Sequence, residues 1–174
     1  QARRRCKRRR AFAPGSVGRT DVEFFDTHVH LNDPRFEGDR EQALERAARS
    51  GVTRLVEIAD GPAEWESAVA LSRARPAVVR CSLGLHPYHA DAFTESLLED
   101  LERKLKLPEV VAVGEIGLDY VKSEVPRQTQ IKTLETMLAA CRAWDKPVVL
   151  HCRGAYDDML SLLRNHYPSR HGSR

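Results

Sequence analysis

The chain has 174 residues, of which 41% are hydrophobic and 30% charged, with 28 basic and 25 acidic residues. This length allows one ordinary domain core, yet it falls short of the roughly 250 residues typical of an eight-unit βα barrel. No segment approaches the ~20 apolar residues of a membrane helix, so a membrane-spanning protein is excluded.

The charge is distributed unevenly along the chain. Eight of the 28 basic residues precede the first acidic residue, Asp21, so residues 21–174 carry 20 basic against 25 acidic residues, a net charge of −5. This balance gives no support for tight non-specific binding of duplex DNA. We expect residues 1–21 to form a disordered Arg-rich tail and residues 167–174 to form a frayed C-terminal end.

The four cysteines, Cys6, Cys81, Cys141 and Cys152, show no C-x-x-C spacing. Neither a thiolate zinc cluster nor a disulfide scaffold is therefore indicated. Free thiols are typical of cytoplasmic proteins, and we expect a cytoplasmic location.

Between residues 22 and 166, strand-like runs alternate with amphipathic helix-like stretches, which predicts an α/β fold of repeated βα units around a parallel sheet. The predicted strands are residues 23–26, 53–58, 78–83, 110–113 and 147–150. The predicted helices are residues 39–50, 62–74, 94–105, 126–144 and 155–166. Two local signals support these bounds, because Pro62 suits a first helical turn and Gly51 suits the residue after a helix.

Two histidines, His28 and His30, lie at the end of the first predicted strand. Strand side chains alternate between faces, so both imidazoles point to the same side. Two imidazoles on one face form half of a metal site. A pair of this kind is only moderately specific by itself, since histidines also occur singly on surfaces and in cores.

Three more candidate ligands follow later predicted strands: His86 after the third, Glu115 after the fourth and His151 after the fifth. Parallel βα architectures place active sites at the C-terminal edge of the sheet. Each residue alone is more often a hydrogen-bonded or capping side chain than a ligand. Their coincidence at one edge predicts a metal site and favours a hydrolase.

Four segments together resemble the successive signatures of the TatD-type metal-dependent deoxyribonucleases, which belong to the amidohydrolase-like barrels. The segments are FDTHVHL at 25–31, GLHP at 84–87, GEIGLDY at 114–120 and PVVLHCR at 147–153. The resemblance covers about residues 22–166. It implies a TIM-barrel-like fold with about five of the eight units, and hydrolysis of phosphodiester bonds in DNA by a water activated by two metal ions.

The resemblance also implies a ligand set. His28, His30 and Glu115 would hold one divalent cation, and Glu115 would bridge to a second that His151 helps to bind. Mixed imidazole and carboxylate ligation suits zinc or manganese better than magnesium, which prefers oxygen ligands. His86 and Arg153 are weaker candidates for contacts with a substrate phosphate, with loop-locking and surface roles as their alternatives.

The family pattern continues with a histidine after a sixth strand and a metal-binding aspartate near an eighth, and neither has a counterpart in this sequence. We therefore expect three βα units to be absent and two sheet edges to be unpaired. We further expect this chain to be truncated, to hold at most a weak metal site and to show little hydrolase activity.

Two other readings remain open. A related barrel hydrolase could act on ester or amide substrates, although Glu115 weighs against relatives that bridge their metals with a carboxylated lysine. The chain could also be a non-catalytic fragment that acts as an interaction module, its open edge binding a partner strand.

Overall fold

The computed structural model describes residues 22–167. The strands are β1 (Phe24–Val29), β2 (Val52–Ala59), β3 (Val79–Leu83), β4 (Val110–Asp119) and β5 (Val148–Arg153). The helices are α1 (Arg40–Arg49), α2 (Pro62–Ala74), α3 (Glu95–Leu105), α4 (Arg127–Trp144) and α5 (Tyr156–His166), with 3-10 helices η1 (Pro34–Phe36) and η2 (Pro87–Ala92). The predicted tail at 1–21 and residues 168–174 of the predicted frayed end lie outside the described residues.

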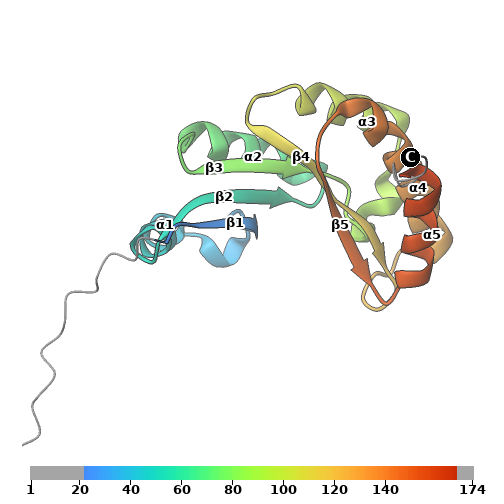
Figure 1. Ribbon diagram of the computed structural model, residues 1–174, viewed down its shortest axis with the longest axis horizontal. Helices are drawn as coiled ribbons and strands as arrows, with labels where there is room; N and C mark the ends of the chain where they lie inside the picture. The colour runs from blue at the N-terminus through green and yellow to red at the C-terminus, as the bar shows by residue number, and fades with distance from the viewer. Residues whose placement is uncertain (1–21, 168–174) are drawn as a thin grey trace, which may run out of the picture.

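The strands form one sheet in the order β1-β2-β3-β4-β5, with every neighbouring pair parallel. Each connection passes through a helix, as a parallel pair requires. Figure 1 shows the sheet curling, with α2 to α5 around its outer side and β1 and β5 at its two ends. This curled half-barrel confirms the predicted α/β fold of five βα units.

The main core lies between the sheet and helices α2 to α5. Its largest buried side chains include Trp65, which is 1% exposed and donates its indole N–H to the Gly84 carbonyl at 3.0 Å. Leu134 and Leu138 of α4 are buried in the same cluster, and Trp144 packs against it. The apolar stripe of α4 therefore faces the core, as helical spacing predicts.

A second, smaller core lies at the β1 side of the sheet. It consists of Leu31, Leu55, Leu71 and Val79, with Val29 and Leu44 among the side chains packed against it. Leu31 comes directly after the two histidines of the first strand, so this cluster anchors the chain where it leaves β1.

Among the described residues, β1 pairs only with β2, and β5 pairs only with β4. Large apolar side chains are exposed at both ends of the sheet: Phe24 (52%) and Phe25 (56%) on β1, and Leu150 (38%) on β5. The expected unpaired edges are therefore present in this part of the chain.

The cysteines of the described region, Cys81, Cys141 and Cys152, are free thiols. Burial raises the pKa of Cys81 to about 11 and that of Cys141 to about 12. Both thiols therefore stay protonated near neutral pH, which suits packing residues. No helix between residues 22 and 167 is long and apolar enough to cross a membrane, and the cytoplasmic location stays a prediction.

Three strands end at least three residues later than the sequence predicts. The first ends at Val29 instead of residue 26, the fourth at Asp119 instead of residue 113, and the fifth at Arg153 instead of residue 150. The fourth was placed too short because Gly114, Glu115 and Gly117 read as the end of a strand. Glu115 and His151 consequently lie within strands rather than after them.

Gly117 allows β4 and β5 to approach closely. It pairs with His151, and a Cβ atom added to Gly117 would overlap with the His151 main chain. A glycine inside a strand marks such a close approach of another backbone. Glycine weakens the strand signal in the sequence, yet the packing of the sheet requires a glycine at position 117.

We expect Gly117→Ala to lower the free energy of unfolding by about 1–3 kcal/mol, the usual cost of overpacking. Chemical denaturation monitored by circular dichroism measures this change. Gly61→Ala is the control, because its added methyl group would meet only the His89 ring, which can move. Equal losses at the two positions would contradict the close-packing explanation.

Candidate metal centre

The candidate ligands gather at the C-terminal edge of the sheet. His28 lies in β1 and His30 directly after it, Glu115 lies in β4, and His151 lies in β5. His86 follows the end of β3 by three residues. The strand register shifts between Asp26 and Val29 and again between Val113 and Ile116, so His28 and Glu115 both lie at strand irregularities, which commonly redirect side chains at functional sites.

Glu115 is shared by two groups of possible ligands. His28, His30 and Glu115 form one group and His86, Glu115 and His151 the other, with the ligand atoms of each group within 4.8 Å of one another. The Oε2 atom of Glu115 lies 3.2 Å from His28 Nε2, and its Oε1 atom lies 2.8 Å from His151 Nδ1. The two oxygens of one carboxylate thus face imidazoles from different strands.

His86 has a defined protonation state. Burial, followed by the neighbouring His151, lowers the pKa of His86 to about 3, so its imidazole is neutral near pH 7. Its Nδ1 accepts the Tyr88 main-chain N–H at 3.2 Å, which places the single ring proton on Nε2. That Nε2 lies 3.0 Å from His151 Nδ1, to which it can donate.

Asp119 orients the other side of the His151 ring. Its Oδ2 lies 3.1 Å from His151 Nε2, and its Oδ1 accepts the main-chain N–H groups of Val121 and Lys122. Burial alone would raise the pKa of Asp119, but these two amides and His151 lower it below its ordinary value. Asp119 is therefore an anion that accepts the His151 Nε2 proton.

These hydrogen bonds bring two acceptors close together. If His151 carries its proton on Nε2, its Nδ1 can accept the His86 Nε2–H at 3.0 Å, but it also lies 2.8 Å from Oε1 of Glu115, a second acceptor. Such a pair repels unless a cation or a second proton on His151 lies between the two atoms. Neutral imidazoles and a carboxylate are also the donors that zinc and manganese take, so the residues present fit a divalent metal.

The backbone around Glu115 is supported by β3. Ser82, which is fully buried, donates its hydroxyl to the Gly114 carbonyl at 2.7 Å. Gly114 has a φ of +136°, which favours glycine, and a Cβ atom added to Gly84 would overlap with the Gly114 main chain. Three small residues therefore let the chain turn Glu115 toward the histidines.

Two further residues lie close to the candidate ligands in the chain. Asp26 accepts the main-chain N–H of His28 at 3.1 Å, so it holds the backbone of a candidate ligand and not its ring. Arg153 is exposed at the end of β5, and its contact with a substrate phosphate stays a prediction.

Sequence reasoning missed Asp60, which follows β2. Burial raises the pKa of this carboxyl, with His30 and Glu115 among the groups that act on it, and its Oδ1 is buried without a hydrogen-bond partner among residues 22–167. Asp119 was also not among the predicted site residues. Its role beside His151 was detectable from strand alternation, because Glu115, Gly117 and Asp119 share one face of β4.

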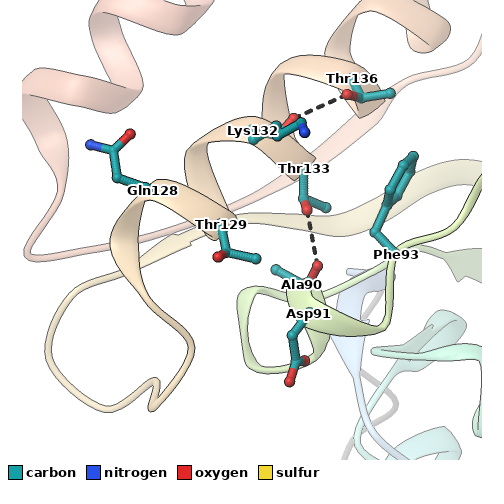
Figure 2. A pocket seen from close by; sticks show the side chains of 8 residues that line it. All are labelled: Ala90, Asp91, Phe93, Gln128, Thr129, Lys132, Thr133 and Thr136. Carbon is teal, nitrogen blue, oxygen red and sulfur yellow. Dashed lines mark hydrogen bonds between the residues drawn. The ribbon is translucent and has the colours of Figure 1, made fainter.

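One pocket adjoins the candidate ligands, and another lies apart from them. A pocket of about 290 Å³ is lined by His30, Asp60 and Glu57 among others, so it adjoins the candidate site. Another, of about 390 Å³, lies between η2 and α4. Figure 2 shows this second pocket, in which Thr133 donates its hydroxyl to the Ala90 carbonyl, and the candidate ligands are not among its lining residues.

The family of TatD related DNases matches residues 25–173, which is most of the chain. The chain belongs to the TatD family. This membership confirms the resemblance seen in the four sequence segments.

Curated TatD-family relatives include a 3'-5' ssDNA/RNA exonuclease TatD from Erwinia billingiae, 33% identical over 86% of this chain and 57% of the relative. Another is the uncharacterized metal-dependent hydrolase YjjV from Escherichia coli, 36% identical over 86% of this chain and 58% of the relative. The chain thus spans a little over half the length of the curated relatives it matches.

Solved structures of TatD-family proteins have the same fold. The crystal structure of YjjV from Escherichia coli aligns with a TM-score of 0.76 at 34% identity, over 82% of this chain and 56% of that chain. A TatD family hydrolase from Entamoeba histolytica aligns with a TM-score of 0.75 at 22% identity, over 83% of this chain and 54% of that chain. The curled five-strand sheet is therefore part of a TIM-barrel-like TatD fold.

We expect Ser82→Ala to lower the free energy of unfolding by about 1–3 kcal/mol, because it removes a buried hydrogen bond to the Gly114 carbonyl. Ser67→Ala is a matched control, since Ser67 also donates to a main-chain carbonyl but is exposed. The control should change stability by no more than about 0.5 kcal/mol. Equal losses in the free energy of unfolding of the two variants, measured by chemical denaturation, would contradict this role of Ser82.

Proposed function

We propose that this edge of the sheet binds two divalent cations and hydrolyses phosphodiester bonds of single-stranded nucleic acid. The observation that carries the proposal is the position of Glu115, whose oxygens face His28 on one side and His151 on the other. In this proposal His28, His30 and Glu115 hold one cation. Glu115 and His151, with His86 beside them, hold the second.

When bound, such cations neutralise phosphate oxygens and lower the pKa of water, so that hydroxide is available near neutral pH. The chain supplies the positions of the donors. Asp119 accepts the Nε2 proton of His151 and thereby directs Nδ1 toward the site. The Glu115 side chain is only 10% exposed, which strengthens its attraction for a cation. The donor set favours zinc or manganese over magnesium.

The proposed substrate class rests on the relatives that are named 3'-5' ssDNA/RNA exonucleases. From Asp21 onward the chain is mildly acidic, so it lacks the excess positive charge typical of proteins that grip a long stretch of backbone. Contacts with a few phosphates at a strand end fit this charge better. Arg153, exposed at the end of β5, is a candidate for one such bidentate contact.

We also propose that the 174-residue chain by itself hydrolyses nucleic acid only weakly. It spans little more than half of its curated relatives, and the apolar side chains of Phe24, Phe25 and Leu150 are exposed at the two ends of its sheet. Burial of such side chains stabilises a barrel and keeps its ligands in place. A version extended by the remaining family region should therefore bind metal more tightly and cleave faster.

Metal titration tests the ligand assignment. We expect isothermal titration with Mn²⁺ to give weaker binding by about 100-fold or more in Glu115→Gln, because both groups lose their shared carboxylate. His28→Ala should affect one group and leave the other. His166→Ala, on α5 and outside both groups, is the control. Binding by Glu115→Gln that equals the control would contradict the shared carboxylate.

Activity is tested with single-stranded oligonucleotides labelled at either end, supplied to the 174-residue chain and to an extended version, each with Mn²⁺ or Zn²⁺. We expect cleavage from the 3' end, abolished by Glu115→Gln and much faster in the extended version. Cleavage of ester, lactone or amide substrates in place of oligonucleotides would show a different hydrolase of the same barrel type. Robust cleavage by the 174-residue chain would contradict its proposed weakness, and no cleavage by either version would favour a binding module.

A further inference from the structure

Glu57 on β2 holds the chain segment that follows His30. It is 1% exposed, and both of its oxygens accept main-chain N–H groups: Oε2 that of Leu31 at 2.6 Å and Oε1 that of Asn32 at 3.0 Å. Val29 of β1 is the register partner of Glu57. The carboxylate therefore grips the chain directly beyond the end of β1.

Arg40 holds the same segment from the other side. Its Nε donates to the Leu31 carbonyl at 2.6 Å, while the Leu31 side chain is 4% exposed in the smaller core. Both main-chain groups of Leu31 and its side chain are thus fixed. Since His30 is the preceding residue, its Cα position and the direction of its Cα–Cβ bond are restrained with them.

The surroundings of Glu57 argue against a role as a packing residue and against a role as a metal ligand. A buried carboxyl is costly, and burial raises the pKa of Glu57 while the two amides oppose that rise. A packing residue at this position of β2 would not need a carboxyl. Glu57 is also absent from both groups of possible metal ligands, and both of its oxygens accept main-chain amides.

We propose that Glu57 is a positioning residue that, together with Arg40, clamps the main chain at Leu31 and Asn32 and so fixes the His30 imidazole beside His28 and Glu115. The inference rests on the proposed function in one respect, that His30 is a metal ligand. The clamp itself follows from the hydrogen bonds around residues 31 and 32.

Two isosteric substitutions separate the effect of losing a carboxylate charge from the effect of losing the main-chain hydrogen bonds of Glu57. Glu57→Gln replaces one acceptor oxygen by an NH₂ group, which must then face an amide N–H. Glu64→Gln is the matched control, because Glu64 lines the same pocket as His30 but accepts only one main-chain N–H, that of Asp60 at 2.9 Å. A glutamine there keeps the single acceptor that is needed. Both variants remove one negative charge near His30.

The metal readout is the dissociation constant for Mn²⁺, measured where circular dichroism shows every variant fully folded. We expect Glu57→Gln to weaken binding by about 10-fold to 100-fold, as for other residues that orient a ligand, and Glu64→Gln to have little effect. In a His30→Ala background, Glu57→Gln should cause no further loss. Additive losses, or equal losses in the two glutamine variants, would overturn the positioning role.

A second readout does not depend on metal. Amide hydrogen exchange at Leu31 and Asn32 should become about 10-fold faster or more in Glu57→Gln, since hydrogen bonds to a charged group are lost. The NOE between the rings of His28 and His30, whose centroids lie 5.2 Å apart, should weaken. If the wild-type chain binds no metal, the proposed function fails while these NMR measurements still decide the clamp. Unchanged exchange and an unchanged NOE would overturn it.

Discussion

The contact of one carboxylate with imidazoles from two ends of a sheet sets the strictest requirement on this structure. β1 and β4 are three strand spacings apart in the sheet order, which in a flat sheet would separate them by about 14 Å. His28 Nε2 nevertheless lies 3.2 Å from Glu115 Oε2, while His151 of the adjacent β5 reaches the other oxygen at 2.8 Å. Only a curled sheet whose C-terminal edge closes inward meets both distances at once.

The residues that hold this arrangement are buried and contribute no ligand atom in our proposal. Ser82 fixes the backbone next to Glu115, Asp119 fixes the His151 ring, and Glu57 fixes the chain beyond His30. All three are no more than 1% exposed. Rigid support of this kind keeps opposed acceptor atoms at short distance until a cation joins them, which is how preorganised sites gain affinity.

The sequence predicted the parts of the fold that depend on local patterns. The five helices and the parallel strands follow from periodicity and from Pro62 and Gly51. The predicted length of β4 was wrong, because Gly114 and Gly117, which weaken the strand signal, are there to admit the backbone of β5. Glu57 was missed for a related reason. A single charged residue within an apolar strand carries no motif, and its partners, the amides of Leu31 and Asn32, lie 26 and 25 residues away in the chain.

The most direct test of the central claim is anomalous diffraction from crystals of this chain soaked in Mn²⁺. The account predicts two anomalous peaks, one on each side of the Glu115 carboxylate. One peak should contact Oε2 with His28 and His30, and the other should contact Oε1 with His151. A single peak at one oxygen would contradict the bridging role of Glu115. Two peaks that both lie out of contact with the Glu115 carboxylate would contradict it as well.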